Sequence, residues 1–231
     1  MSSRSEVPGT ILTLPDLPRW VEAHGMAADP ASWQRALGNG VAVGHDTEGL
    51  IVVAGDADLA EITALAALPH AMIFARDDLA RATGRSIVRI GVHTLPGDDP
   101  AAAFDEAVPD LEGALRLPDD AALDHLPPAL AGELARWRRA RPIWTAYVDG
   151  EPVSFAYAPW RSARWFDISV YTAPGARQLG LGRLVTATLI RDELAQGRAP
   201  VWGAEDDDAA GLRLGRALGF VEIDALWLAA P

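Results

Sequence analysis

The stretch Asp167-Ile-Ser-Val-Tyr-Thr-Ala-Pro-Gly-Ala-Arg-Gln-Leu-Gly-Leu-Gly-Arg183 decides the fold of this chain. Its first part carries β-branched residues at Ile168, Val170 and Thr172, which predict a half-buried strand. A Pro-Gly pair then ends the strand. Apolar residues recur at helical spacing over residues 177–189. The stretch therefore predicts a strand, a sharp turn and the start of a helix.

Gly180 and Gly182 stand where this helix begins. The first N–H groups of a helix have no partner within the helix and carry partial positive charge. Because glycine lets a ligand approach the backbone closely, a strand followed by a Gly-rich helix start predicts an anion site suited to phosphate. The alternative is that the glycines only let the helix pack tightly on a sheet. So short a motif does not by itself decide between the two.

The composition bounds the class of protein. The chain has 231 residues, 49% of them hydrophobic, so it can form one large domain or two small ones. It contains no cysteine, which excludes disulfides, thiolate metal sites and a cysteine nucleophile. A net charge of −12 argues against a nucleic-acid partner. No apolar run has the length of a membrane span, so we expect a cytoplasmic protein without a membrane partner. The five histidines show no ligand spacing, and we expect no metal site.

The first half of the chain alternates between helical and strand patterns. We expect one short helix after Pro18 and a second from Asp29 to Leu37, which Gly38 ends. The segments after Gly38 form a compact ββαβαβ unit over residues 41–94, with a hairpin at 41–54, a helix capped by Asp56, and strands at 71–75 and 86–94. Residues 95–109 are rich in Pro, Gly and Asp and predict a linker or surface loop.

We expect the second half to begin with two helical pieces, one introduced by Leu117-Pro-Asp-Asp120 and one introduced by residues 125–128 that runs from about Ala129 to Arg141. A meander of three strands follows over 143–148, 152–158 and 164–172, with Asp149-Gly150 as a type I′ turn. After the Gly-rich turn we expect a helix to Gln196, a strand at 200–204, a helix that the acidic run 206–208 caps, and a last strand or hairpin at 220–228.

This order resembles the conserved core of the GNAT superfamily of N-acetyltransferases. Arg177-Gln-Leu-Gly180-Leu-Gly182 matches that family's acetyl-CoA signature, which is Gln or Arg, two residues, Gly, one residue, then Gly or Ala. Leu218-Gly219-Phe220 resembles the end of its last helix. The resemblance covers roughly residues 115–228. It implies an α/β (α+β) fold with a mixed, mostly antiparallel central sheet flanked by helices. Residues 111–231 would form the catalytic core, and residues 1–110 an N-terminal α/β extension of uncertain role.

The resemblance also implies where acetyl-CoA binds. The strand backbone at Val170, Tyr171 and Thr172 would pair with the pantetheine arm, and a backbone N–H there could stabilise the oxyanion. The turn and helix start would hold the pyrophosphate with these residues: Arg177, Gln178, Leu179, Gly180, Leu181, Gly182 and Arg183. The alternative for Arg183 is a solvated position on the helix. Asp208, at the start of the last helix, occupies a position where many members of the family have Asn.

The acid and base of the reaction are less well marked. Asp167 and Glu205 are the carboxylates nearest the expected thioester, and a base is needed because a free amine is mostly protonated at neutral pH. Asp167 could instead pair with Arg164 or face solvent, and Glu205 could belong to the acidic helix cap. Many members of the family carry a Tyr on the last helix as the acid. Here Gly215 stands at that position, and Gly211 lies one turn before it.

The resemblance implies an acetyl-CoA-dependent N-acetyltransferase with a primary amine of a small molecule or peptide as acceptor. Transfer would be direct, since the chain has no cysteine nucleophile. The missing Tyr keeps open a non-catalytic acyl-CoA-binding or regulatory module with the same fold. A third hypothesis makes residues 1–110 a degenerate second GNAT-like unit that interacts with a partner or closes over the substrate. A homodimer is allowed, and the acceptor is not identified.

Overall fold

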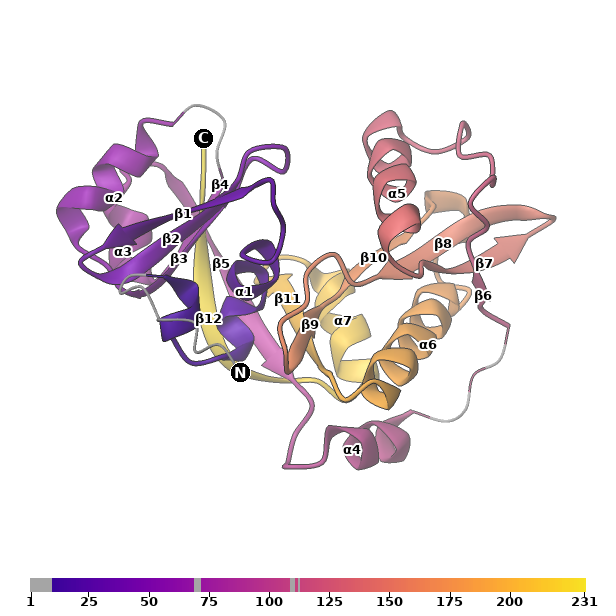
Figure 1. Ribbon diagram of the computed structural model, residues 1–231. Helices are drawn as coiled ribbons and strands as arrows, with labels where there is room; N and C mark the ends of the chain where they lie inside the picture. Colours follow the sequence, from indigo (N-terminus) through magenta and orange to yellow (C-terminus); the bar gives the residue numbers. More distant parts are fainter. Residues whose placement is uncertain (1–9, 69–71, 109–110, 112) are drawn as a thin grey trace, which may run out of the picture.

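The structure is a computed structural model that describes residues 10–68, 72–108, 111 and 113–231 (Figure 1). The chain forms two halves joined by a central sheet, with the N- and C-terminal strands meeting in the same half. The first half contains, in chain order, two 3₁₀ turns, four α-helices and five strands: η1 Ile11–Thr13, η2 Pro18–Trp20, α1 Val21–Met26, β1 Ser32–Leu37, β2 Asn39–His45, β3 Leu50–Asp56, α2 Leu59–Ala66, β4 Met72–Ala75, α3 Asp77–Ala82, β5 Ser86–Thr94 and α4 Pro100–Ala107.

The second half begins with a short strand and a long helix, and then builds a meander. Its described elements are β6 Leu115–Arg116, α5 Pro128–Ala140, β7 Trp144–Val148, β8 Glu151–Tyr157, β9 Trp165–Asp167, β10 Ser169–Thr172, η3 Pro174–Ala176, α6 Leu181–Ala195, β11 Ala199–Glu205, α7 Ala209–Ala217 and β12 Val221–Ala230. Asp149 and Gly150 between β7 and β8 both have positive φ, at 50° and 83°, which confirms the type I′ turn.

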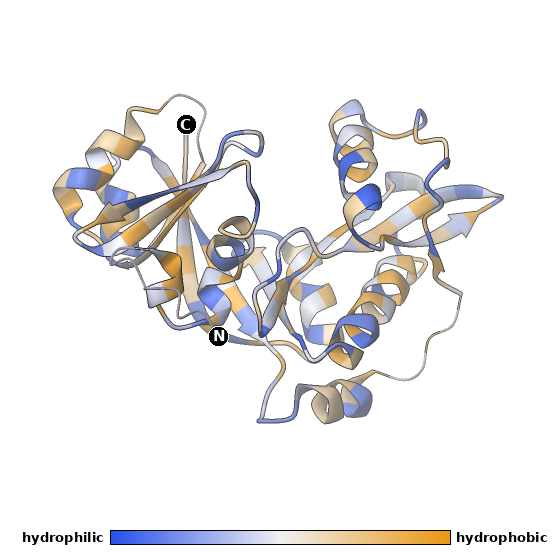
Figure 2. Ribbon diagram, in the orientation of Figure 1, coloured by the Kyte–Doolittle hydropathy of each residue, from blue (hydrophilic) through white to orange (hydrophobic). Residues whose placement is uncertain are grey.

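Two sheets carry these strands. Eight strands lie in the order β1-β2-β3-β4-β12-β5-β11-β9, and four in the order β10-β8-β7-β6. The pairings are antiparallel except for β3 with β4 and β9 with β11. Helices cover the sheets (Figure 1). Hydrophobic residues run along the strands, while the helices carry both hydrophobic and hydrophilic residues (Figure 2). The predicted fold, a mixed and mostly antiparallel sheet flanked by helices, is confirmed.

The last strand joins the two halves. β12 pairs with β5 from Val221↔Thr94 to Ala230↔Ser86 and with β4 on its other side. The hydrogen bonds of this sheet therefore connect strands that lie before and after the expected domain boundary near residue 110. Whether residues 1–110 form a domain of their own stays a prediction.

The segment predicted as a helix from Asp29 to Leu37 is a strand, so this prediction was wrong. β1 pairs with β2 over six positions, from Ser32↔His45 to Leu37↔Gly40. The indole of Trp33 lies over Gly44, where a Cβ would come within 2.1 Å of its ring. The two strands form a hairpin around Gly38 and Asn39, with Gly38 at a φ of 62°. This hairpin pairing outweighs the helical spacing of the apolar residues.

Three further expectations need correction. The predicted linker at 95–109 contains α4, whose N-cap Asp99 accepts hydrogen bonds from the N–H groups of Ala101 and Ala102, both at 3.1 Å. Phe104 on this helix is fully buried, which the loop-like composition concealed. The helical piece expected from Leu117-Pro-Asp-Asp120 onward is absent, since residues 117–127 contain only turns, a bend and irregular backbone. The cap of α2 is Asp58 and not Asp56, since the Asp58 carboxylate accepts from Ala60 N–H at 3.0 Å.

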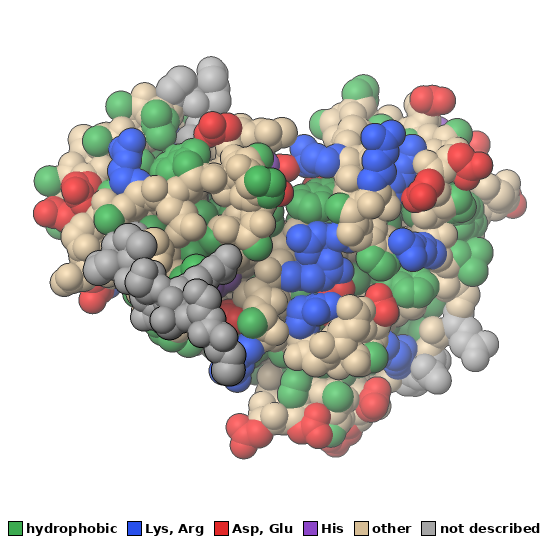
Figure 3. Space-filling view, viewed as in Figure 1, with side chains coloured by type: hydrophobic (Ala, Val, Ile, Leu, Met, Phe, Trp, Pro, Cys, Tyr) green, Lys and Arg blue, Asp and Glu red, His purple; other side chains and the backbone are tan. Residues whose placement is uncertain are grey.

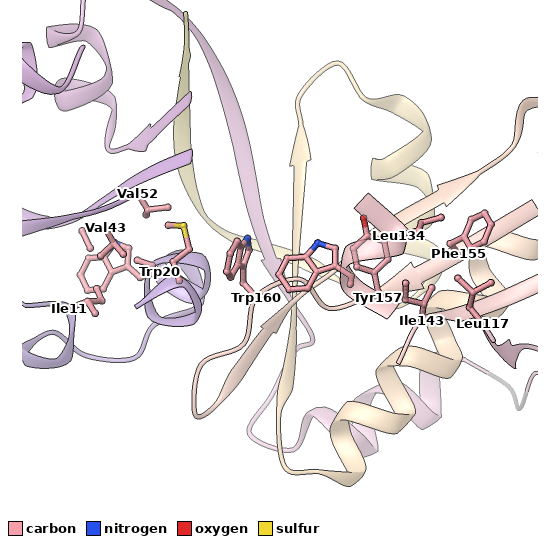
Figure 4. Close-up of a cluster of buried hydrophobic side chains, with 14 of the residues drawn as sticks. Ile11, Trp20, Val43, Val52, Leu117, Leu134, Ile143, Phe155, Tyr157 and Trp160 are labelled. Carbon is pink, nitrogen blue, oxygen red and sulfur yellow. The ribbon is translucent and has the colours of Figure 1, made fainter. Parts of the chain in front are cut away.

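A hydrophobic core runs through both halves. Figure 4 shows Trp160 between side chains of the first half, such as Trp20 and Val43, and those of the second half, such as Tyr157. Trp160 packs edge-on against Trp137 with ring centroids 5.4 Å apart. Burial of large aromatic side chains on both sides of this contact supplies hydrophobic free energy that holds the halves together.

Charged side chains are unevenly spread over the face seen in Figure 3. Lys and Arg side chains gather in its middle, at the hollow between the two halves, and Asp and Glu side chains lie mostly at its margins. The sequence contains no lysine, so these cations are arginines. One pair, Arg136 of α5 with Glu48 of the β2–β3 loop, joins the halves at 3.0 Å.

Candidate functional site

The predicted third strand of the meander is divided between the two sheets. β9 pairs in parallel with β11, from Trp165↔Ala199 to Asp167↔Val201. After Ile168 the chain joins the other sheet, where β10 pairs with β8 from Ser169↔Tyr157 to Thr172↔Ser154. β10 and β11 therefore separate beyond Asp167, and among the described strands none pairs with the second edge of β10. An extended ligand could add to this edge as a strand does.

A buried ion-pair network holds the closed end of this separation. The side chain of Glu193 on α6 is fully buried and bonds Arg161, before β9, and Arg198, before β11. The Arg161 Nε and Arg198 Nε atoms lie 2.9 and 2.6 Å from the two oxygens of Glu193. Burial acts to raise the pKa of Glu193, but the two guanidiniums outweigh it and hold this pKa below its usual value. The network fixes the starts of β9 and β11 side by side.

The Gly-rich turn lies at the open end of β10. Gln178 and Gly180 have positive φ, at 63° and 77°, and an added Cβ at Gly180 would meet no atom within 4 Å. The first helical bond of α6 runs from Leu184 N–H to Gly180 C=O at 3.0 Å, so the N–H groups of Leu181, Gly182 and Arg183 precede it. A Cβ at Gly182 would lie 3.2 Å from Oγ1 of Thr172, which shows how closely α6 begins beside β10.

The other residues of the turn face solvent. Arg177, Gln178, Leu179 and Gly180 are exposed, and Arg177 Nε donates to the C=O of Thr172 at 3.2 Å. The structure therefore brings the predicted pyrophosphate residues to the end of the strand whose free edge contains Val170, Tyr171 and Thr172. The turn and helix start offer a concave set of N–H groups with a positive dipole, which suits an anion.

A cleft of about 470 Å³ lies beside the point where the strands separate. Both predicted catalytic carboxylates line it, together with Asp208. The remaining lining residues are apolar or small apart from a further carboxylate, Glu22 of α1: Phe74, Ile90, Gly203, Ala204 and Leu228. We call this space, with Glu22, Asp167, Glu205 and Asp208 on its lining, the acidic cleft. No Arg or His is among its lining residues.

Sequence reasoning missed Glu22. It lies on a six-residue helix in the half that the family resemblance does not cover, and no local motif marks it. Gly25 sets its position, because a Cβ there would lie 2.8 Å from Arg161 N and 2.9 Å from the Cβ of Trp160. α1 therefore packs directly on the loop before β9 and brings Glu22 beside Asp167, with which it also lines a small adjoining pocket.

The two inner carboxyls of the acidic cleft have unusual acidities. Burial, and then the charge of Asp167, raise the pKa of Glu22 to about 8. Burial raises the pKa of Asp167 to about 7, against a smaller opposing effect of a hydrogen bond from the Ile168 backbone. No ion pair joins either carboxyl to an arginine among the described residues. A carboxylate with a pKa near neutral is a better proton acceptor than an ordinary one.

Asp208 and the glycines of α7 have structural roles. The Asp208 carboxylate caps α7 by accepting from the N–H groups of Ala210 and Gly211, at 3.2 and 2.9 Å. A Cβ at Gly211 would collide with this carboxylate, at 2.2 Å from Oδ2. A Cβ at Gly215 would lie 3.0 Å from Nε1 of Trp202. Close packing thus accounts for both glycines.

Two general features of the described residues bear on ligands. None of their helices has the length and apolar character needed to cross a bilayer. They also contain no group of three or more His, Asp or Glu side chains arranged to hold a metal ion.

Comparison with known proteins shows a similarity in sequence over part of the chain and in fold over nearly all of it. Residues 144–226 match the model of the GNAT acetyltransferase family. A putative GNAT-family acetyltransferase from Novosphingobium aromaticivorans has the same fold, with a TM-score of 0.64, 19% identity, and coverage of 93% of this chain and 96% of that one. A GCN5-related N-acetyltransferase-like protein from Streptococcus suis gives 0.63 at 16% identity, with 96% and 95% covered.

A tandem GNAT protein from the clavulanic acid biosynthesis pathway also aligns, with a TM-score of 0.51, 15% identity, and coverage of 92% of this chain and 94% of that one. No curated protein matches the sequence. Residues 144–226 are therefore similar to the GNAT acetyltransferase family, and the chain as a whole has the fold of structures described as GNAT acetyltransferases.

Proposed function

We propose that this protein transfers the acetyl group of acetyl-CoA directly to a primary amine of a small molecule or peptide. The observation that carries the proposal is the position of the acidic cleft. Its carboxylates face the point where β10 separates from β11, within the residues that match the GNAT acetyltransferase family. A negatively charged cleft attracts an ammonium group, and a proton acceptor there can make the amine nucleophilic.

The residues around the separation fit acetyl-CoA. The free edge of β10 at Val170–Thr172 would take the pantetheine arm, and the N–H groups at Gln178–Arg183 would hold the pyrophosphate. Arg177 is exposed beside this turn and can add positive charge. The open space over Gly180 supports the assignment, because a phosphate needs a close approach to the backbone. Bound acetyl-CoA supplies the thioester that the amine attacks.

Within the acidic cleft the carboxylates have different tasks. Asp167 lies where the strands separate and takes the proton of the ammonium, since its raised pKa of about 7 makes it basic enough at neutral pH. Glu205 ends β11 at the exposed side and attracts the cationic acceptor. Asp208 caps α7 and thereby shapes the cleft. Its contact with acetyl-CoA stays a prediction.

The alternative is a GNAT-fold module that binds an acyl-CoA without transferring the group. The observation that favours it is α7, whose described residues include no Tyr to protonate the departing thiolate. The packing of Gly215 on Trp202 leaves no room there for a large side chain without rearrangement. In the enzyme, water would then have to supply this proton.

Two measurements separate these functions. Acetyl-CoA at millimolar concentration should raise the melting temperature, because a ligand of the native state stabilises it by mass action. Thiol release is then followed over a panel of small amines and peptide N-termini, with Asp167→Asn as the inactive control. The chain has no lysine, so acetylation of its own side chains would not add to the background. Binding without release over the whole panel would favour the module, and no thermal shift would end both proposals. A cytoplasmic location and a homodimer stay predictions.

A further inference from the structure

The element order of the first half is repeated in the second. β1, β2 and β3 are followed by α2, β4, α3 and β5. β7, β8 and the divided strand β9–β10 are followed by α6, β11, α7 and β12. Each series therefore reads as three strands, helix, strand, helix, strand. In each, the third strand is parallel to the fourth, and the helix between them makes the crossover.

The sheet order has the same symmetry. Read from β1, the strands run β1-β2-β3-β4-β12-β5-β11-β9, and β10-β8-β7 continue the meander in the second sheet. If each strand is replaced by its counterpart in the other half, the same order of strands results, read from the opposite end. The last strand of each half lies next to the fourth strand of the other, β12 beside β4 and β5 beside β11. Short β6 is outside the repeat. The two halves are thus related as two copies of one unit that exchange their last strands.

The first copy lacks the features that fit acetyl-CoA. The β3 residues that pair in parallel with β4 are Leu50, Ile51 and Val52, so none of them carries a carboxylate as Asp167 does in the parallel pairing of β9 with β11. The turn between β3 and α2 is short and acidic. Asp58 fills the helix start with its own carboxylate, and Asp56 pairs with Arg76 at 2.6 Å. An anion at this helix start would meet two negative charges in place of open N–H groups.

The first copy instead contributes to the site of the second. Glu22 on α1 faces Asp167 in the acidic cleft, and Phe74 of β4 and Ile90 of β5 form part of its apolar lining. Asp167, Glu205 and Asp208 come from the second copy. The cleft is therefore composed from both copies, and only one copy keeps the open turn.

We propose that the first half is a GNAT-like unit that binds no acetyl-CoA and forms half of the acceptor site, with Glu22 as the residue that binds the acceptor's ammonium beside Asp167. The inference rests on the proposed function for the nature of the acceptor. The positive charge of the bound ammonium favours the ionised form of both carboxyls, so Asp167 and Glu22 share the ammonium by charged hydrogen bonds. Asp167 takes one proton of the ammonium, and the lone pair of the resulting amine then forms the C–N bond with the thioester carbonyl. The thiolate leaves with the electron pair of the broken C–S bond, and the second proton that the nitrogen loses reaches the thiolate through water.

Binding stoichiometry tests the first part without any acceptor. Titration calorimetry of the full chain with acetyl-CoA should give one site per chain, and Gly182→Val should remove it. Two sites per chain, or a site that survives Gly182→Val, would overturn the proposal that the first half binds no acetyl-CoA. Absence of any binding would instead refute the proposed function itself, so the two failures are distinguishable.

Kinetics test the role of Glu22. With any amine that the wild type acetylates, Glu22→Gln should raise KM for the amine about tenfold, as expected for the loss of a charged hydrogen-bond partner. The dissociation constant for acetyl-CoA should not change, and Glu22→Asp should recover part of the loss. Glu61→Gln, an exposed position on α2 of the same half, is the matched control.

A merely structural role for Glu22 would lower the melting temperature and leave KM for the amine alone. Equal KM for Glu22→Gln, Glu61→Gln and the wild type would contradict the proposal while leaving the proposed transfer reaction intact. A rise in the dissociation constant for acetyl-CoA would also contradict it, because Glu22 would then act at the cofactor side.

Discussion

Gly215 of α7 lies directly on the indole of Trp202 in β11, where a Cβ would come within 3.0 Å of Nε1. Trp202 is buried, and its strand β11 is paired on both sides, so the side chain has little freedom to move away. The contact seats α7 on the sheet and thereby places its N-cap Asp208, and Glu205 just before it, at the acidic cleft. The absence of a side chain at Gly215 therefore allows the packing that positions Asp208 and Glu205.

Substitution of Gly215 by Ala should destabilise the protein. A Gly→Ala change in an open helix position stabilises by about 1 kcal/mol, but overpacking against Trp202 costs about 1–3 kcal/mol. We expect a net loss, measured by urea unfolding. Gly132→Ala in α5 is the control, since an added Cβ there meets nothing within 4 Å, and it should stabilise. A gain of stability in both variants would show that Trp202 yields.

Removal of Glu193 should be among the most costly single changes in the chain. Glu193→Ala leaves Arg161 and Arg198 without their buried counter-ion, and breaking a buried pair in this way costs about 3–5 kcal/mol. Urea unfolding with Glu106→Ala on exposed α4 as the control measures the difference. If the two variants lose equal stability, solvent must already compensate the two arginines.

The same network predicts sensitivity to acid. The pKa of Glu193 is lowered in the folded protein, so its ionised form contributes stability at pH values above the pKa of an unfolded glutamate. This stability is lost as the pH falls through the lower, folded value. Between pH 5 and pH 3 the melting temperature should fall more steeply for the wild type than for Glu193→Gln. Parallel curves would mean that other carboxylates dominate acid unfolding.

The acidic cleft predicts the opposite pH dependence. The pKa of Glu22 is raised from 4.5 to about 8 by folding, so the folded state holds more protons than the unfolded state over this range. Stability therefore falls as pH rises from about 4.5 to about 8, by on the order of 1 kcal/mol or more. Glu22→Gln should flatten this decline in thermal unfolding. An unchanged slope would show that Glu22 is well solvated.

The Gly-rich turn predicts which change abolishes cofactor binding. At a concentration of acetyl-CoA 100 times its dissociation constant, stabilisation of about 2.7 kcal/mol corresponds to a rise in melting temperature on the order of 5 °C. Gly182→Val should remove this rise, because its side chain would occupy the space between α6 and Thr172. Gly175→Ala in the same turn meets nothing within 4 Å and should retain the rise.

The local pattern predicted most elements of the second half. Type I′ turn chemistry at Asp149-Gly150 fixes the hairpin, and the spacing of apolar residues after Gly180 fixes α6, because both depend on neighbours in the sequence. The same logic fails for β1. Its Trp33 suits either a helix face or a strand. Only the pairing of β1 with β2, which places the indole over Gly44, decides between the two.

The candidate site divides in the same way. The sequence indicated the Gly-rich turn and the carboxylates Asp167 and Glu205, which the structure places around one separation of strands. It gave no sign of Glu22, since a single carboxylate on a short helix has no local signature. It also did not reveal that one predicted strand divides between two sheets at Ile168.

The sequence by itself determined the parts of this protein whose physics is local: the type I′ turn, the Gly-rich turn, the start of α6 and the family that they resemble. Only the tertiary structure decided the exchange of β5 and β12 between the halves and the meeting of Glu22 with Asp167. These depend on strand pairings and packing between residues far apart in the chain. Their free energy comes from burial and sheet hydrogen bonds that no short stretch encodes.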